Sequence, residues 1–380
     1  MTDWDKIRKD FPVTKNKTYF LSAAMSPIPI PVFNAILQEY RTLHELGELN
    51  FPKDMERFKK LCGDIAELMN TNADNITFVQ NTSTAMSLLA LSFKNQIKPP
   101  FNIISMQDEF PSSTVGFEYL GIKMRYAQPL NARYPIASIL DMIDNHTLAV
   151  ITSQVQYATG FQQNLIALGK ELRSRDILFF VNSTQAFPFY PIDVQAAHID
   201  VLTASLHKWG LTGHIGTMFF TTPEFRELFP TPCAGWLSIN TKGKSFIHTG
   251  KNIPFHLHST AHCYDSGTFN LQAVLAFQTA LDYINQIGIT IIQNRIIELT
   301  DYLIAGLRKL NITIISPVSE SEERSAIVSF TLGNNNKEFI DACAQQHILL
   351  SPRDGNIRVS VNIFNNFADI DKLLRCLTPD

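Results

Sequence analysis

The stretch Ile177-Leu178-Phe179-Phe180-Val181-Asn182-Ser183-Thr184-Gln185 decides the fold class of this chain. Five apolar residues in succession are typical of a strand that is buried on both faces, as the strands of parallel sheets are. Polar residues follow at once, which predicts that the strand ends in a cleft. Amphipathic patterns such as Ser83–Phe93 and Asn164–Ser174 separate this run from similar runs elsewhere. Strands that alternate with helices predict an α/β domain with a mostly parallel sheet.

Short apolar runs of this kind predict a sheet of roughly seven strands. They are Ile76–Val79, Asn102–Ser105, Lys123–Ala127, Ala149–Thr152, Ile177–Val181, Val201–Ala204 and Gly216–Thr221. Only Leu206–Ile215 lies between the last two runs, which is too short for an ordinary helical crossover. We therefore predict that this connection is a functional loop.

The pattern changes after about residue 265. Two long helical patterns, Asn270–Ile287 and Ile289–Leu310, are followed by short strands and two further helices. A chain of 380 residues is also longer than one compact core usually holds. We predict a large α/β domain over residues 15–265 and a small C-terminal α+β domain over residues 266–380, on which residues 1–14 pack.

The composition argues against several classes of protein. Hydrophobic residues make up 45% and charged residues 18% of the chain, as in a folded globular protein. The net charge of −3 argues against nucleic-acid and membrane-surface partners. No apolar run approaches the ~18 residues of a membrane span, and the start lacks a signal-peptide pattern. Neither the five cysteines nor His256, His258 and His262 have a convincing metal-ligand arrangement, so we expect a cytoplasmic protein without a metal site.

Polar segments follow three of the predicted strands, and ligands of open α/β sheets bind at the carboxyl ends of strands. Gln80-Asn81-Thr82-Ser83-Thr84 opens a helix and suits a phosphate, although an ordinary helix cap has the same composition. Asn182-Ser183-Thr184-Gln185 either presents two amides to a cleft or simply caps its strand. Ser205-Leu206-His207-Lys208-Trp209-Gly210 places a lysine at a strand end, where it is either solvated or able to form an imine with an aldehyde cofactor.

Taken together, these segments resemble the class V aminotransferases, which depend on pyridoxal 5′-phosphate (PLP) and have fold type I. That family includes cysteine desulfurases, selenocysteine lyases and isopenicillin N epimerase-like enzymes. The resemblance begins at Tyr19-Phe20-Leu21-Ser22-Ala23-Ala24, is strongest from Val181 to Gly216, and reaches the last predicted helix. Val155-Gln156-Tyr157-Ala158-Thr159-Gly160-Phe161 looks most similar to the isopenicillin N epimerase-like branch. The resemblance implies a large domain with a seven-stranded sheet, a small C-terminal domain and PLP as the cofactor.

The resemblance also implies a role for each matching residue. Lys208 would be catalytic, because it would form a Schiff base with PLP and later carry the α-proton. The remaining cofactor contacts would come from Thr82, Ser83, Ser205 and His207 at the phosphate, Gln185 at the ring hydroxyl, Asn182 at the ring nitrogen and Phe110 stacked on the ring. Arg358 would clamp the α-carboxylate of the substrate, with Tyr157 nearby. Thr268 would reach the phosphate of a neighbouring subunit, which implies a homodimer with shared active sites.

Asn182 departs from the family pattern. The family places an aspartate there, whose charge keeps the pyridine nitrogen of PLP protonated. An amide supplies no negative charge, so we expect the nitrogen to be mostly unprotonated and a carbanion at the α-carbon to be less stabilised. Activity would then be reduced, or directed to racemisation or elimination.

A second departure is a missing cysteine. Desulfurases of the family carry a nucleophilic cysteine shortly before the arginine that binds the carboxylate. The matching stretch here, Ser351-Pro352-Arg353-Asp354-Gly355-Asn356, has none. Cys343 lies on a predicted helix, Lys337–Gln346, and is expected to be a core residue. The sequence therefore argues against a cysteine desulfurase.

We predict an enzyme of the class V aminotransferase type that acts at the α-carbon of a small amino acid through Lys208. One alternative is an amino-acid racemase, epimerase or selenocysteine lyase-like enzyme on the same scaffold. Another is a catalytically silent PLP-binding protein, because Asn182 replaces the aspartate.

Overall fold

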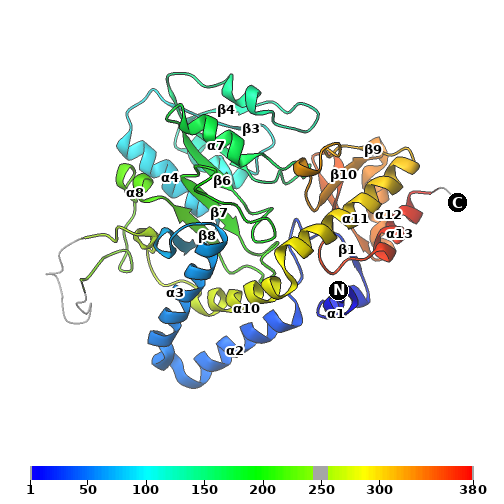
Figure 1. The fold of residues 1–380 in the computed structure, drawn as a ribbon, viewed down its shortest axis with the longest axis horizontal. Helices are drawn as coiled ribbons and strands as arrows, with labels where there is room; N and C mark the ends of the chain where they lie inside the picture. Colours follow the sequence, from blue (N-terminus) through cyan, green and yellow to red (C-terminus); the bar gives the residue numbers. More distant parts are fainter. Residues whose placement is uncertain (1, 243–255, 379–380) are drawn as a thin grey trace.

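The computed structural model describes residues 2–242 and 256–378 of the chain. Its central feature is a seven-stranded sheet that runs through the larger body of the molecule (Figure 1). In spatial order its strands are β2 (Ile76–Val79), β8 (Thr217–Thr221), β7 (Val201–Ser205), β6 (Leu178–Asn182), β5 (Thr147–Ser153), β3 (Asn102–Met106) and β4 (Lys123–Ala127). All neighbouring pairs are parallel except those that involve β8. The prediction of a mostly parallel, seven-stranded sheet is confirmed.

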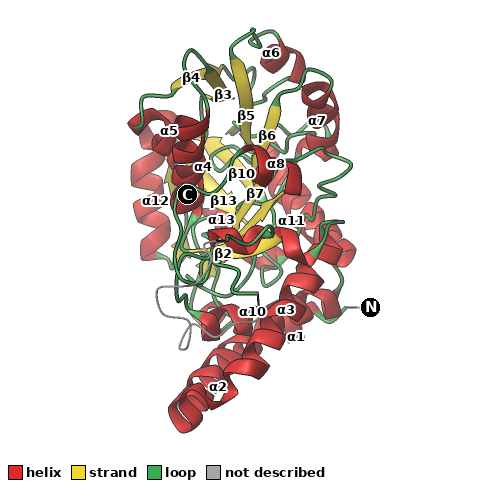
Figure 2. Ribbon diagram, turned by 90° about the vertical axis from the view of Figure 1, so that its left-hand side faces the viewer, coloured by secondary structure: helices red, strands yellow, loops and turns green. Residues whose placement is uncertain are grey.

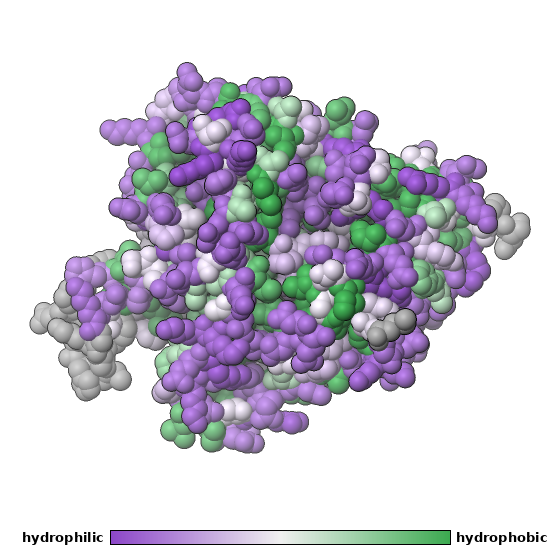
Figure 3. Space-filling model, viewed as in Figure 1, coloured by the Kyte–Doolittle hydropathy of each residue, from purple (hydrophilic) through white to green (hydrophobic). Residues whose placement is uncertain are grey.

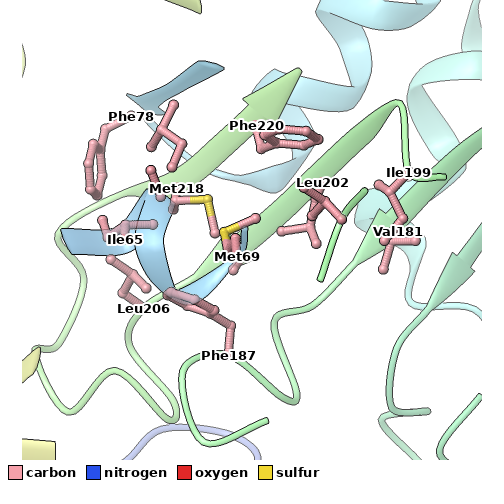
Figure 4. Packing of buried hydrophobic residues seen from close by; sticks show 14 of the residues in the cluster. Ile65, Met69, Phe78, Val181, Phe187, Ile199, Leu202, Leu206, Met218 and Phe220 are labelled. Carbon is pink, nitrogen blue, oxygen red and sulfur yellow. The ribbon is translucent and has the colours of Figure 1, made fainter. Parts of the chain in front are cut away.

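The strands form where the apolar runs predicted them because the sheet is covered on both faces. Phe179 and Val181 of β6 belong to one apolar cluster, and Phe180 between them belongs to another. Figure 4 shows Val181 with Leu202 of β7 and other members of the first cluster. Since alternate side chains of a strand point to opposite faces, burial of both faces requires the continuous apolar sequence.

Helices supply the two covering layers. On one face lie α3 (Phe51–Leu68), α7 (Leu165–Arg173) and α10 (Leu271–Ile287), and on the other lies α4 (Thr82–Gln96). The short helices of this body are α5 (Val115–Tyr119), α6 (Ile136–Leu140) and α8 (Pro223–Leu228). The connection Leu206–Ile215 needs no helix, because β7 and β8 are antiparallel and a short loop can join them.

The smaller body is built on a four-stranded antiparallel sheet. Its strand order is β12 (Ser351–Arg353), β13 (Asn356–Ser360), β10 (Ile327–Thr331) and β9 (Thr313–Ile314). The helices beside it are α11 (Ile289–Lys309), α12 (Asn336–Gln345) and α13 (Phe367–Cys376). Strand β12, which contains Pro352, was not predicted from the sequence.

The start of the chain lies against the smaller body. Helix α1 (Trp4–Lys9) carries Arg8, whose Nη1 donates to Asp369 of α13 at 2.7 Å. Strand β1 (Thr18–Tyr19) pairs in parallel with β11 (Ile348–Leu349). Helix α10 packs with the core of the larger sheet as far as Leu281, whereas its Ile284 belongs to the apolar cluster of the smaller body. The exact division into domains stays a prediction.

Helix α2 (Ile30–Leu46) projects from the larger body beside α10 (Figures 1 and 2). It carries exposed apolar side chains at helical spacing, which are Ile30, Phe33, Leu37, Tyr40, Leu43 and Leu46. Hydrophilic side chains cover most of the face seen in Figure 3. None of the described helices is both long and apolar enough to cross a membrane. The described residues also contain no group of three or more His, Cys, Asp or Glu side chains suited to a metal ion.

Candidate active site

A cavity of about 370 Å³ opens at the carboxyl ends of the parallel strands. The larger body contributes the ends of β5, β6 and β7 and the start of α4, and the smaller body contributes β12 and β13. Ten of the predicted site residues line it: Thr82, Ser83, Phe110, Tyr157, Asn182, Gln185, Ser205, His207, Lys208 and Arg358. Residues separated by up to 276 positions, from Thr82 to Arg358, therefore meet at one place, which is the switch-point edge of an open α/β sheet.

Lys208 follows β7 and is almost completely buried, with 8% of its surface exposed. Its Nζ forms no hydrogen bond or ion pair with any residue in the described ranges 2–242 and 256–378, and it lies 5.6 Å from the centre of the Phe110 ring. Burial lowers the pKa of Lys208 to about 7, helped by the positive charges of Arg358 and Arg353. A large fraction of this amine is therefore neutral near pH 7, and a neutral amine is a nucleophile and a base.

The loop that carries Lys208 is held from both sides. The backbone N–H of Ser26 donates to the carbonyl of His207 at 3.1 Å. Trp209 Nε1 donates to Gln185 Oε1 at 3.2 Å, and Gln185 Nε2 donates in turn to the carbonyl of Ala23 at 2.9 Å. These bonds connect the loop to β6 and to the N-terminal segment, so that the lysine is presented from a fixed backbone.

The start of α4 forms a group of hydrogen-bond donors. Asn81 caps the helix, because its Oδ1 accepts the N–H of Thr84 at 2.9 Å. The N–H groups of Thr82 and Ser83 have no partner among the described residues and lie at the positive end of the helix dipole. The hydroxyls of Thr82 and Ser205 are 3.0 Å apart. Such a cluster suits a phosphate or another anion.

His207 and His214 add two imidazoles to this end of the cavity, with ring centres 4.7 Å apart. Burial lowers the pKa of His207 to about 4, and the charges of Lys208 and His214 act in the same direction. His207 is therefore neutral at pH 7, and its ring donates one hydrogen bond and accepts another.

Asn182 is fixed by two hydrogen bonds at the end of β6. Its Oδ1 accepts the N–H of Thr184 at 3.0 Å, and its Nδ2 donates to Ser113 Oγ at 3.0 Å. The two bonds assign the orientation of the amide, so that one further N–H of Nδ2 is left to act as a donor. Among the described residues, no aspartate or glutamate lines the cavity.

Glu109 is buried and does not line the cavity itself. Its carboxylate accepts the backbone N–H groups of Ser153 at 2.7 Å and Phe110 at 2.9 Å, and Ser113 Oγ donates to it at 3.3 Å. Burial raises the pKa of Glu109, although these donors oppose the shift. Ser113 thus connects Glu109 to Asn182. This network could not be predicted from the sequence, because it depends on contacts between segments far apart in the chain.

Arg358 on β13 is buried, with 1% of its surface exposed. Its Nη1 donates to the carbonyl of Tyr157 at 2.6 Å and its Nη2 to Ser351 Oγ at 3.4 Å, whereas its Nε is buried without a partner. It forms no ion pair with a described carboxylate. Burial lowers the pKa of Arg358 to about 9, and the charge of Arg353 acts in the same direction. A buried guanidinium of this kind is suited to a carboxylate ligand.

Two aromatic rings form one wall of the cavity. Phe110 and Tyr157 meet edge to face, with ring centres 5.2 Å apart. The hydroxyl of Tyr157 donates to Asp354 at 3.4 Å. Phe110 is partly exposed and cannot titrate, so it offers a flat apolar surface at every pH.

Thr268 is the one predicted site residue that lies outside this cavity. It lines a second depression beside the first, and His214 lines both. Its predicted role at the site of a neighbouring subunit stays a prediction.

Several residues that line the first cavity were not predicted as site residues: Ala23, Ala24, Asn81, Ser112, Ser153, Thr184, His214 and Arg353. Most of them sit in segments that the resemblance already included. Arg353 had no local signal, because its strand is only three residues long and contains a proline.

None of the five cysteines of the chain lines the cavity. Cys343 is buried on α12, and burial raises the pKa of its thiol to about 12. A thiol of this kind stays protonated at pH 7 and is a poor nucleophile.

The chain is similar to known proteins over almost its whole length. The family model described as Aminotransferase class-V matches residues 18–373. A probable cysteine desulfurase of Pyrococcus abyssi is 23% identical, with 98% of this chain and 96% of that protein covered. The apo structure of a cysteine desulfurase from Thermococcus onnurineus NA1 has a TM-score of 0.88 at 20% identity, over 99% of this chain and 97% of that one. A lysine-to-alanine variant of C-DES with glycine covalently linked to its PLP cofactor has a TM-score of 0.88 at 19% identity, over 99% of both chains.

Proposed function

The chain belongs to the class-V aminotransferase family, and we propose that it is a PLP-dependent enzyme that acts at the α-carbon of a small amino acid through Lys208. The observation that carries this proposal is the buried, unpartnered amine of Lys208 in a cavity lined by cations and hydroxyls. The likeness to the isopenicillin N epimerase-like branch stays a prediction.

The cavity suits PLP and an amino-acid substrate in charge and in donors. PLP carries a phosphate and an aldehyde, and the substrate carries an α-carboxylate. The unpaired N–H groups at the start of α4, the largely neutral amine of Lys208 and the guanidinium of Arg358 are matching partners for these three groups. No described carboxylate faces the cavity to repel the two anions.

We assign the cofactor contacts as the sequence predicted them. Thr82, Ser83, Ser205 and His207 would hold the phosphate, and Gln185 would donate to the ring hydroxyl. Phe110 would stack on the ring, because it lies beside Lys208. Asn182 would donate the free N–H of its amide to the ring nitrogen. When bound, PLP withdraws electrons from the α-carbon of the substrate and weakens the bonds to it.

Arg358 would then bind and orient the substrate, and Lys208 would transfer its α-proton. Arg358 clamps the α-carboxylate and so fixes which bond of the α-carbon faces the cofactor ring. Lys208 would hold the aldehyde group of the cofactor, and its amine, once released by the substrate, would take the α-proton and return it. A pKa of about 7 suits an amine that must both remove and return the proton near neutral pH.

Asn182 favours a second candidate, an isomerase or a lyase on the same scaffold. Without a carboxylate at this position, the chain would not keep the ring nitrogen protonated, and the bound cofactor would withdraw electrons less strongly. Racemisation and some eliminations need less delocalisation than transamination. The relatives named as cysteine desulfurases point to carbon–sulfur cleavage, but a similar reaction here would need a sulfur acceptor other than a thiol of this chain in the cavity.

We also propose a homodimer in which each site is completed by its neighbour. Two observations support it. Thr268 lies outside the cavity of its own chain, and α2 carries a row of exposed apolar side chains that is typical of a covered surface.

The proposed function is tested by the visible absorbance of the purified protein with added PLP. Wild type should show a yellow band that changes when the right amino acid is added, and Lys208→Ala should lose the band. Lys170→Ala, at an exposed lysine on α7, is the matched control and should keep it. No band in wild type would overturn the proposal. A band without α-deuterium exchange from any amino acid would leave only a silent PLP-binding protein.

A further inference from the structure

The lining of the cavity contains one cation to which the proposed function gives no task. Lys208 and Arg358 are assigned to the cofactor and to the α-carboxylate, but Arg353 also lines the cavity. Among the described residues, its guanidinium forms no ion pair, and its Nη1 donates to the carbonyl of the preceding residue, Pro352, at 2.7 Å.

The position of Arg353 follows from the register of the small sheet. Ser351 of β12 lies opposite Arg358 of β13, and Arg353 lies opposite Asn356. Side chains two residues apart on a strand share a face, so Arg353, Ser351 and Arg358 all point to the same side of the sheet. Arg353 and Arg358 are therefore diagonal neighbours, a relation in which Cα atoms are about 7–8 Å apart. The Nη2 of Arg358 reaches Ser351 Oγ at 3.4 Å on that same face.

Arg353 lies close enough to the other polar groups of the cavity for its charge to act on them. Burial lowers the pKa of Lys208 and of Arg358, and the positive charge of Arg353 adds to both shifts. The same charge opposes the rise in the pKa of Tyr157 that burial causes. The nearest acid in sequence, Asp354, is exposed, and its carboxylate accepts the hydroxyl of Tyr157. Among the described residues that line the cavity no carboxylate separates Lys208, Arg353 and Arg358, so their charges repel one another, and a bound anion removes part of that repulsion.

We propose that Arg353 binds a second acidic group, located on the side chain of the substrate, so that the enzyme selects a dicarboxylic amino acid. This inference rests on the proposed function and names its substrate class. Arg358 holds the α-carboxylate, and Arg353 holds the side-chain carboxylate from the neighbouring position on the same face. A planar guanidinium suits a carboxylate because it can donate two parallel hydrogen bonds.

The test measures binding rather than turnover. The dissociation constants of the holoenzyme for L-aspartate, L-glutamate and L-alanine are obtained from the change in visible absorbance. Arg353→Gln should weaken binding of the better acidic amino acid about 10- to 150-fold, the range that follows from losing a charged hydrogen bond. It should change the value for L-alanine less than about 3-fold. The comparison of aspartate with glutamate reports which chain length fits.

Two control variants accompany this experiment. Arg175→Gln removes an exposed arginine that pairs with Glu171 on the surface, and it should leave all three constants unchanged. Arg353→Lys keeps the charge and loses the planar donor, so it should retain part of the preference. Calorimetry with succinate and propionate, which do not react, should show the same loss for the dicarboxylate alone.

Two results would overturn the inference while leaving the proposed function intact. If Arg353→Gln weakens aspartate, glutamate and alanine equally, Arg353 shares the α-carboxylate with Arg358. If it weakens none of them, Arg353 has no part in substrate binding. In both cases the wild-type band still responds to amino acids. Absence of any band would instead refute the proposed function itself, and with it this inference.

Discussion

Replacing Asn182 with aspartate tests the most consequential departure of this chain from its family. The side chain is fixed by Thr184 and Ser113, so the substituted carboxylate should occupy the same place. A hydrogen bond to a charged group contributes about 1.5–3 kcal/mol and a neutral one about 0.5–1.5 kcal/mol, a gain of about 1–2 kcal/mol. If the gain appears in the transition state for proton removal, α-deuterium exchange should accelerate about 5- to 30-fold.

The same substitution should cost stability when no cofactor is bound. Asn182 loses its donation to Ser113, and Ser113 has a single proton to share between the new carboxylate and Glu109. A buried donor or acceptor that loses its partner costs about 1–3 kcal/mol, and repulsion between the two carboxyl groups raises the pKa of Glu109 further. Thermal unfolding of the apoprotein should therefore shift to lower temperature, and PLP should recover part of the loss.

Asn102→Asp is the matched control for this prediction. Asn102 is equally buried, at the beginning of β3, and its Nδ2 donates to Asp144 at 2.9 Å. The control should lower the unfolding temperature without any effect on exchange, because it lies at the opposite edge of the sheet from the cavity. The rate of α-deuterium exchange is measured by NMR at saturating PLP. If Asn182→Asp exchanges at the wild-type rate, the idea that the amide weakens stabilisation of the α-carbanion is wrong.

Two further predictions concern the lysine and the dimer. The rate at which the apoprotein attaches PLP should rise about tenfold per pH unit below pH 7 and level off above it, because the lowered pKa of about 7 leaves Lys208 neutral at higher pH. The rate is measured by stopped-flow absorbance. A rate that keeps rising to pH 10 would show that Lys208 has the pKa of an ordinary lysine. Lys208→Ala and Thr268→Ala chains are unfolded and refolded together, so that about half of the dimers contain one chain of each kind. If each site combines both subunits, one of the two sites in such a dimer has both wild-type residues, and activity should return in about a quarter of all sites. The separately refolded variants are the control, and no gain on mixing would contradict the shared site.

The sequence allowed the prediction of the large sheet because a strand buried on both faces needs apolar residues in succession. Ile76–Val79 was predicted with its observed bounds, and the run at Ile177–Val181 was displaced by one residue from Leu178–Asn182. The polar segments after these strands were expected to meet, since parallel strands end at one edge. Thr82, Asn182 and Lys208 line one cavity for that reason.

The contacts between distant segments could not be predicted in the same way. Strand β1 pairs with β11 across most of the chain, and two-residue strands leave no periodic pattern. Arg353 reaches the cavity only because the small sheet docks against the large one. No role was predicted for Glu109, because its burial results from Ser113, Ser153 and Phe110, which surround it and donate hydrogen bonds to it.

The charge distribution of the cavity links its reactivity to its binding. Lys208, Arg353 and Arg358 repel one another, and this repulsion adds to burial in lowering the pKa of Lys208. The same positive potential attracts the phosphate and carboxylates that the family chemistry requires. Anions that bind only the folded chain stabilise it, and this offsets the repulsion among the three cations. A carboxylate in the lining would weaken both effects. Because position 182 is an amide and Glu109 is separated from the cavity by Ser113, the electrostatic potential of the cavity stays positive. The same arrangement means that no negative charge is present to keep the ring nitrogen of the cofactor protonated.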